Sequence, residues 1–166
     1  MIAFGHTAIG AVVGLYTYQL IGDSDPLKGL ITAGSVGVIS HYIADFIPHG
    51  HFFRPKDNKK WLTIVIIFDL FLSLAIFSGL AHLKFGLSLE LLYVLFGIGG
   101  SQLPDVVNGL VSVGSLPNKG IFRLEDRFHN NVIHWHGFKN NALLWSKTDI
   151  WQVSVVIISL ILILWF

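Results

Sequence analysis

The chain has 166 residues, of which 53% are hydrophobic and only 13% charged, and its mean hydropathy is +0.66. Because a soluble domain carries about 25% charged residues, this composition excludes an ordinary water-facing globule, a disordered segment and a nucleic-acid-binding tail. The absence of cysteine excludes a disulfide scaffold, a thiolate metal site and a cysteine nucleophile.

Five apolar runs follow one another along the chain, each long enough or nearly so to cross a hydrocarbon layer of ~30 Å as a helix of ~20 residues. Backbone polar groups in lipid must be satisfied internally, and the runs lack period-two alternation, so the sequence predicts helices rather than a barrel. The runs are Ile2–Ile21, Gly29–Ile47, Trp61–Ala81, Leu87–Leu103 and Ile150–Phe166. We expect a single integral membrane domain over residues 1–166, an all-α bundle of about five transmembrane helices.

Small residues recur at a spacing of four in two of these runs, at Gly10 and Gly14 and at Gly97 and Ser101. Such pairs let membrane helices approach each other closely. Ordinary membrane-helix composition accounts for them equally well, so both interpretations stay open.

The charges between the runs predict an orientation. If the N-terminus, the loop 48–60 and the loop 108–149 share one side, that side holds nine of the Lys and Arg residues, and only Lys28 and Lys84 face the other. The positive-inside rule then predicts a multi-pass protein of the inner (cytoplasmic) cell membrane with its N-terminus in the cytoplasm. We expect the long segment 108–149, of mixed polarity, to lie on the cytoplasmic membrane surface as a loop or amphipathic segment.

Ionisable residues gather toward this cytoplasmic side. His6 lies in the first turns of the first run, His41 and Asp45 near the end of the second, Asp69 in the third and Asp105 at the end of the fourth. A charged side chain at the middle of a membrane helix costs ~2.5–3.5 kcal/mol on insertion scales. Such groups persist where they meet a partner, a cavity or a metal ion.

Two histidine patterns have spacings that suit metal ligands. His41 and Asp45 share a helical face because they are four residues apart, and His51 follows ten residues after His41 across a Pro-Gly turn. Imidazole combined with carboxylate suits zinc, manganese or iron rather than calcium. His134 and His136 can bind one ion in an extended backbone. The alternatives are a hydrogen-bonded helical pair with interfacial histidines, and a surface loop whose histidines titrate.

Four segments carry a family resemblance: Gly5-His6-Thr7-Ala8-Ile9-Gly10, His41 to Asp45, Arg54-Pro55 with Lys59 through Asp69, and Gly100 to Val106. Together they resemble the bacterial membrane-bound metal-dependent hydrolases, also described as LexA-binding inner-membrane hydrolases. The motif order is rearranged here, because His-x3-Asp precedes the Pro-Asp motif, and the stretch His129–His134 replaces the family's His-Arg-Gly-Thr-His motif. A looser similarity links His41, Asp45 and His51 to zinc-dependent phospholipase C.

The clustered residues and the resemblance together imply a metal-dependent hydrolase acting at the cytoplasmic leaflet, where it contacts the lipid bilayer. We expect one or two divalent ions, zinc first and manganese or iron as alternatives, and a phospholipid-like phosphoester as substrate. Catalytic roles go to Asp69 and His129. The predicted metal ligands are His6, His41, Asp45, His51, Asp105, His134 and His136. The cations expected to attract an anionic headgroup are Arg54, Lys59, Lys60 and Arg127.

Two other functions remain open on the sequence. A proton- or metal-coupled transporter could use Asp69, His41 and Asp45 as a relay, but the outer halves of the runs offer hydroxyl and amide side chains and no ionisable group deep in the layer. A non-catalytic membrane protein could bind a metal for folding or dock a partner on the long loop. Flux into liposomes without hydrolysis would favour the transporter.

Overall fold

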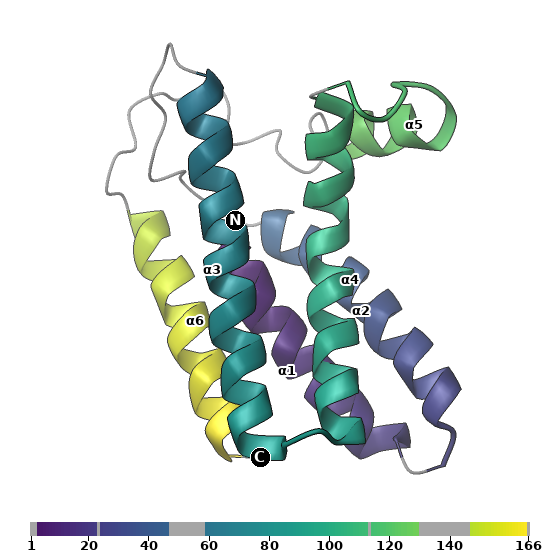
Figure 1. Ribbon diagram of the computed structural model, residues 1–166, viewed down its shortest axis with the longest axis vertical. Helices are drawn as coiled ribbons and strands as arrows, with labels where there is room; N and C mark the ends of the chain where they lie inside the picture. Colours follow the sequence, from purple (N-terminus) through teal and green to yellow (C-terminus); the bar gives the residue numbers. More distant parts are fainter. Residues whose placement is uncertain (1–2, 23, 47–58, 113, 130–146, 166) are drawn as a thin grey trace.

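The computed structural model describes residues 3–22, 24–46, 59–112, 114–129 and 147–165, and all regular secondary structure within these ranges is helical (Figure 1). The predicted all-α class is therefore confirmed. Six helices follow in order: α1 (Ala3–Ile21), α2 (Pro26–Phe46), α3 (Lys59–Phe85), α4 (Leu89–Ser112), α5 (Gly120–Phe128) and α6 (Lys147–Trp165). The five long helices correspond to the five apolar runs, and α5 is a short sixth helix inside the segment expected to contain an amphipathic element.

One helix among the described residues combines the length and the apolar character needed to cross a membrane. The segment Ile67–Phe85 of α3 is long and apolar enough to span a bilayer, whereas the apolar part of α6, Trp151–Trp165, is shorter. Only 17% of the α3 segment is buried inside the molecule, unlike the core helix of a soluble protein. One such helix is weak evidence for a membrane, and a five-span topology stays a prediction.

Local sequence signals set several helix ends. Asp25 accepts a hydrogen bond from the backbone N–H of Lys28 at 3.1 Å, and Pro26 occupies the first turn of α2, a combination typical of helix starts. Helix α3 ends before Gly86, whose φ of 65° is the left-handed conformation that glycine adopts readily, and the Gly86 N–H bonds the His82 carbonyl at 2.8 Å.

Helix α4 extends further than the sequence indicated. The fourth apolar run was expected to end at Leu103, before a proline, but α4 continues through Pro104 to Ser112. Proline removes the donor to the carbonyl four residues earlier, and its ring crowds that carbonyl, yet α4 continues through Pro104 as one helix. Asp105 therefore lies within a helix, two turns before its end, rather than at the terminus.

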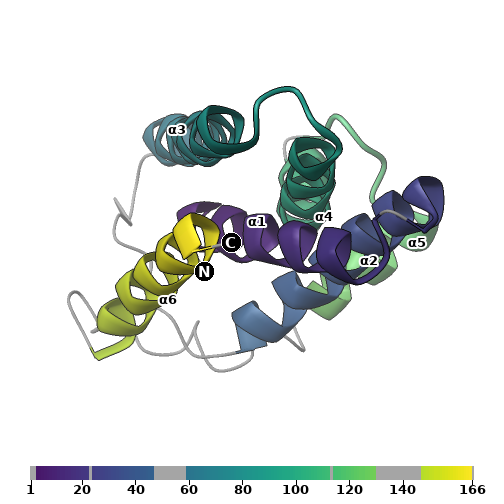
Figure 2. The same cartoon turned by 90° about the horizontal axis from the view of Figure 1, so that it is seen from below.

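Helix α1 lies at the centre of the bundle, where it contacts α2, α3, α4 and α6 (Figure 2). Helices α1 and α4 approach each other closely where the small residues predicted for packing lie. These residues are Gly10 and Gly14 on α1 and Gly97 and Ser101 on α4. A methyl group built on Gly97 would lie 2.7 Å from the backbone nitrogen of Gly14, and one on Gly37 would lie 3.0 Å from the backbone nitrogen of Ser101. The face of α4 around Gly97 and Ser101 thus packs directly against the backbones of α1 and α2.

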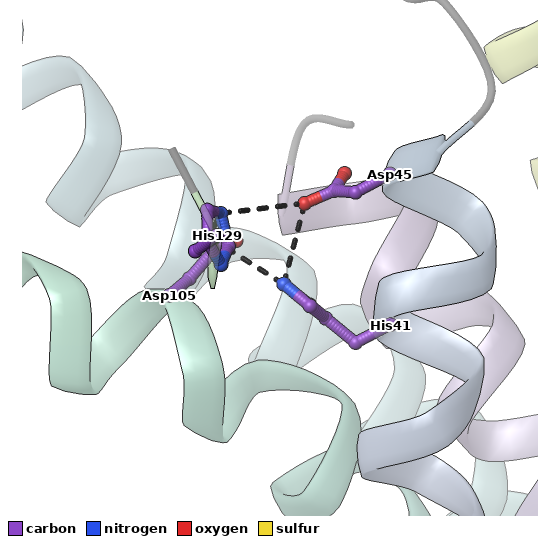
Figure 3. Close-up of side chains that lie close together, drawn as sticks. All are labelled: His41, Asp45, Asp105 and His129. Atoms are coloured by element: carbon purple, nitrogen blue, oxygen red, sulfur yellow. Dashed lines mark ion pairs between the residues drawn. The ribbon is translucent and has the colours of Figure 1, made fainter. Parts of the chain in front are cut away.

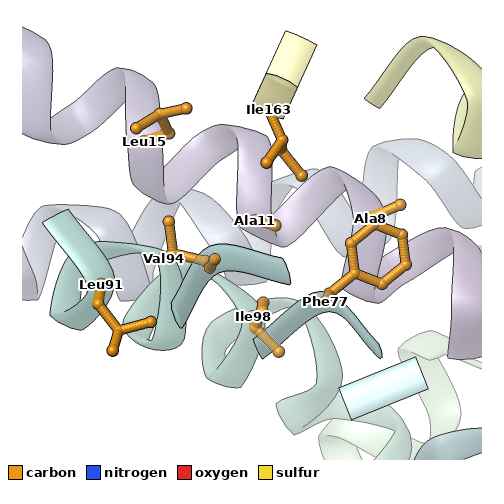
Figure 4. Close-up of a cluster of buried hydrophobic side chains, with 9 residues drawn as sticks. Ala8, Ala11, Leu15, Phe77, Leu91, Val94, Ile98 and Ile163 are labelled. Carbon is orange, nitrogen blue, oxygen red and sulfur yellow. The ribbon is translucent and has the colours of Figure 1, made fainter. Parts of the chain in front are cut away.

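An apolar core joins α1, α3, α4 and α6 (Figure 4). Small and medium side chains of α1 meet larger ones from its neighbours, and the buried members are Ala8, Ala11, Leu15, Phe77, Ala81, Leu91, Val94, Ile98 and Ile163. Lys84 fixes the end of α6 because its ammonium donates to the carbonyls of Ile163 and Leu164 at 2.7 and 2.8 Å. These contacts hold the helices whose other ends carry the ionisable residues.

A buried polar layer separates this core from the ionisable residues. The Thr7 and Ser73 hydroxyls lie 3.0 Å apart, and the Gln102 side chain donates to the Thr7 hydroxyl at 2.6 Å and to the Ala3 carbonyl at 2.7 Å. Ser101 donates to the His6 carbonyl at 2.8 Å. These hydrogen bonds fix how far α1, α3 and α4 are shifted along their axes relative to one another. They therefore fix which residues of α4 lie beside His6.

Candidate metal centre

Four side chains from three separate segments converge at the end of α2 (Figure 3). His41 and Asp45 come from α2, Asp105 from α4, and His129 is the residue that follows α5. Each contributes one ligand atom, and these four atoms all lie within 4.8 Å of one another. The gathering of far-apart imidazoles and carboxylates, on which the predicted site depends, is therefore present among the described residues.

The distances between these ligand atoms match those in a tetrahedral metal site. His41 Nε2 lies 3.3 Å from Asp45 Oδ2 and 3.8 Å from Asp105 Oδ1, and His129 Nε2 lies 3.6 Å from each of the same two oxygens. Bonds of 2.0–2.2 Å to a tetrahedral zinc ion place neighbouring ligand atoms about 3.3–3.6 Å apart.

The backbone of α4 sets the orientation of His41. Its ring Nδ1 lies 2.7 Å from the Ser101 carbonyl, and because a carbonyl only accepts, Nδ1 carries the proton and Nε2 keeps its lone pair. That Nε2 is buried and has no hydrogen-bond partner among the described residues. A buried polar atom without a partner is destabilising, and a metal ion would supply the missing interaction. The donor set and this orphaned atom fit a divalent ion.

A carboxylate also holds His129, and the sequence analysis missed it. Glu125 Oε1 lies 3.3 Å from His129 Nδ1, at ion-pair distance but without the geometry of a hydrogen bond, and His129 Nε2 lies near Asp45 and Asp105. Glu125 and His129 are four apart, the same spacing as His41 and Asp45, so that spacing could have revealed the pair. Burial, reinforced by the negative charges of Asp126 and Asp105, raises the pKa of Glu125 to about 7.

Aromatic contacts seat α5 against α2 at this point. The Tyr42 ring packs edge-on against Phe128 with ring centroids 5.3 Å apart, and it also contacts His41 at 5.4 Å. His129, for which a catalytic role was predicted, lies among the four candidate ligands, and the catalytic role stays a prediction. His129 depends on α5, so the centre is complete only when α5 is docked.

The burial of the two carboxylates differs greatly. The Asp45 side chain is 1% exposed, whereas that of Asp105 is 37% exposed. The centre is therefore closed on the α2 side and open on the side of α4. Solvent or a substrate group can approach along Asp105.

His6 lies beside the four-residue group. Its imidazole is completely buried and stacks on that of His41, with centroids 4.1 Å apart and planes inclined by 27°. Its Nε2 lies 3.0 Å from Asp45 Oδ1 and 4.0 Å from Asp105 Oδ2. The structure thus brings together His6, His41, Asp45, Asp105 and His129.

Asp69 is not one of the four residues whose ligand atoms gather at the centre, although its carboxyl interacts electrostatically with His6 and Asp105. Its Oδ2 accepts a hydrogen bond of 2.9 Å from the backbone N–H of Ala3, the first residue of α1. The first N–H groups of a helix have no partner within the helix, and a carboxylate there also opposes the positive end of the helix dipole. In the structure Asp69 caps α1, whereas the sequence analysis gave it a catalytic role.

The remaining predicted site residues divide into three groups. Arg127 lies exposed on α5. Lys59 and Lys60 begin α3, but the structure does not describe their side chains. Four residues lie outside the described part of the chain: His51, Arg54, His134 and His136.

Comparisons with protein-family models, with curated proteins and with solved structures found no match to this chain. The resemblance to membrane-bound hydrolases therefore stays a prediction, and the functional argument depends on the geometry of the centre.

Proposed function

We propose that this chain is a membrane-embedded metal-dependent hydrolase with its His/Asp centre at the cytoplasmic face, acting on lipid phosphoesters. The observation that carries the proposal is the group of two buried imidazoles, one buried carboxylate and one partly exposed carboxylate whose four ligand atoms lie within 4.8 Å of one another. A divalent ion held there would lower the pKa of a bound water and stabilise charge that develops on a phosphoryl or acyl oxygen.

Each residue of the centre would have a different role in such a site. His41 is held in one tautomer by the Ser101 carbonyl, and Glu125 orients His129. Asp45 supplies a fixed, buried negative charge, while the partly exposed Asp105 lines the approach from solvent. Catalytic metal sites keep a coordination position for water or substrate, so the proposal requires that the partly exposed Asp105 yields its position or that the ion takes a fifth ligand.

The surface of the molecule supports a lipid environment. Large apolar side chains are exposed along the long helices, including Ile39 and Ile43 on α2, Phe68 and Phe71 on α3, and Ile161 on α6. Soluble monomers rarely expose extended apolar surfaces of this kind. If these helices cross the bilayer, the surface is covered by acyl chains.

Helix α5 favours a substrate at the membrane surface. Its side chains Ile121, Leu124 and Phe128 are 74%, 67% and 44% exposed, and at spacings of three and four they form one apolar stripe. Arg123 and Arg127 are exposed on the same short helix. An apolar stripe flanked by arginines suits a helix lying at the headgroup level, and its arginines would attract a phosphate group beside the centre.

Metal analysis combined with turnover tests the proposal. We expect the purified wild-type chain to retain a divalent ion and to hydrolyse the phosphodiester of phosphatidylglycerol in mixed vesicles. The variants Asp45→Asn and His41→Gln should lose the ion and at least 100-fold in turnover. His82→Gln, which alters an exposed histidine at the far end of α3, serves as the matched control.

Each result bears on a different part of the proposal. Full metal content in both site variants would overturn the ligand assignment. Metal lost from the variants but no hydrolysis by the loaded wild type would overturn the enzyme and leave a non-catalytic metal-binding protein.

A further inference from the structure

The oxygen atoms of Asp45 and Asp105 face in two directions. Asp45 Oδ2 and Asp105 Oδ1 are the atoms near His41 Nε2 and His129 Nε2, at 3.3–3.8 Å. The second oxygen of each carboxylate, Asp45 Oδ1 and Asp105 Oδ2, lies instead near His6 Nε2, at 3.0 and 4.0 Å. Each carboxylate therefore presents one oxygen to each of two neighbouring positions.

We infer that His6 marks a second cation position, bridged to the first by the carboxylates of Asp45 and Asp105. This inference rests on the proposed metal centre and deepens it, because it sets the number of ions at two. The first position is held by His41, His129 and one oxygen of each aspartate. The second is held by His6 and the other oxygen of each aspartate.

The surroundings of His6 provide an independent observation. The side chain is completely buried, and neither ring nitrogen has a hydrogen-bond partner among the described residues. The approach of Nε2 to Asp45 Oδ1 is short, but it lacks the geometry of a hydrogen bond. A buried ring nitrogen that lies near two carboxylate oxygens without bonding either of them suits a ligand whose cation lies between the three atoms, and a buried polar atom left without a partner is destabilising.

The stacking of His6 on His41 also favours two ions over protonated rings. Two imidazolium ions with ring centroids 4.1 Å apart would repel each other in a buried site. Two neutral rings whose Nε2 atoms lie beside different oxygens of the same carboxylate can each bind a separate cation. The negative charge of two bridging carboxylates then offsets the charge of the ion pair.

A bridged pair narrows the class of substrate. Two ions about 3.5–4 Å apart stabilise both the attacking and the leaving oxygen during displacement at phosphorus. The second position therefore favours a phosphoester over a carboxylic ester as the bond that is cleaved. On this basis His6 is a metal ligand and not a packing residue of α1.

The number of ions per chain tests this inference. We expect the metal-free wild-type chain in detergent to take up two equivalents of Mn²⁺ or Zn²⁺, measured by isothermal titration and elemental analysis. The Mn²⁺ form should show the exchange-coupled spectrum of a pair by electron paramagnetic resonance. His6→Gln and the smaller His6→Asn should take up one equivalent and lose the coupled spectrum, whereas His82→Gln should keep both.

The outcomes separate this inference from the enzyme proposal. One equivalent in the wild type, or two in both folded His6 variants, overturns the second position, whatever the turnover. Two coupled ions in a chain that hydrolyses no phosphoester support the second position and refute the enzyme. No bound ion in the wild type refutes both. Because the spectrum is recorded on the wild type, a variant that fails to fold does not leave the question open.

Discussion

The carboxylate of Glu125 lies 3.3 Å from His129 Nδ1, its nearest approach to a candidate ligand, and it also interacts with the charge of Asp105. A carboxylate at the second nitrogen of a ligating imidazole fixes the ring and makes it more basic, and losing such a partner typically weakens metal affinity by about 10–100-fold. Glu125→Gln should therefore weaken Zn²⁺ binding by about that factor and leave the protein folded. Competition with a chelating dye measures the dissociation constant.

Asp126→Asn is the control for this prediction, because it removes the same charge from the neighbouring residue of α5. We expect its affinity for Zn²⁺ to stay within about twofold of the wild type. Equal weakening in both variants would mean that the general negative charge of α5, and not the contact with His129, sustains the affinity.

Asp69 provides a second test at the scale of one residue, because its cap and its predicted catalytic role have different consequences. Removing a capping side chain costs about 0.5–2 kcal/mol, and asparagine caps nearly as well as aspartate. Asp69→Ala should lower the free energy of unfolding by that amount, and Asp69→Asn should restore most of it. Denaturation in mixed micelles, followed by circular dichroism, gives both values.

Turnover of the same two variants distinguishes the roles. A cap predicts that Asp69→Asn hydrolyses substrate at close to the wild-type rate. A loss of 100-fold or more in Asp69→Asn, with unfolding unchanged, would reinstate Asp69 as a catalytic carboxylate.

Among the helices, the crossing of α1 and α4 positions His6 against Asp105. At this crossing a methyl group on Gly97 would lie 2.7 Å from the nitrogen and 2.9 Å from the Cα of Gly14, and backbone atoms cannot move aside as a flexible side chain can. Overpacking of this kind costs about 1–3 kcal/mol. Gly97→Ala should therefore destabilise the protein by about that amount and weaken metal binding, because it separates α1 from α4.

Gly99 is a matched control two residues further along α4. A methyl group there would meet no atom within 4 Å, and alanine stabilises a helix by about 0.5–1 kcal/mol relative to glycine. Gly99→Ala should be neutral or stabilising in the same unfolding measurement. A similar loss of stability in both variants would locate the effect in α4 itself rather than in the crossing.

The sequence predicted the elements better than it predicted their ends. Long apolar runs define helices because backbone burial leaves few other solutions, and His41 with Asp45 was visible because both lie on one turn of one helix. The extension of α4 was missed because a proline is a strong helix-ending signal that tertiary packing here overrides. The contact of Glu125 with His129 was missed, and the contact of Asp69 with Ala3 was not predicted. Both depend on how separate helices pack.

In the molecule as a whole, the two ends of the bundle differ in character. The metal centre, α5 and the C-terminal end of α4 lie toward one end, and the turns α1–α2 and α3–α4 lie at the other together with the end of α6 (Figure 1). Three cations, Lys119, Arg123 and Arg127, accompany α5, and two, Lys28 and Lys84, lie at the other end of the bundle. The sequence predicts a cytoplasmic α5 from the excess of Lys and Arg on one side of the membrane. These residues are the part of that excess that the structure describes.

Cysteine labelling tests this orientation without background, because the chain contains no cysteine. Ser24, in the α1–α2 turn, and Ser115, between α4 and α5, are both exposed and lie at opposite ends of the bundle. In intact spheroplasts a membrane-impermeant maleimide should label Ser24→Cys, and it should label Ser115→Cys only after the membrane is permeabilised. The reverse pattern would place the metal centre on the outer side, where the headgroups of the outer leaflet would be its substrates. Labelling of neither site before permeabilisation would mean that the chain does not cross the membrane, because a protein confined to the cytoplasm is shielded at both ends.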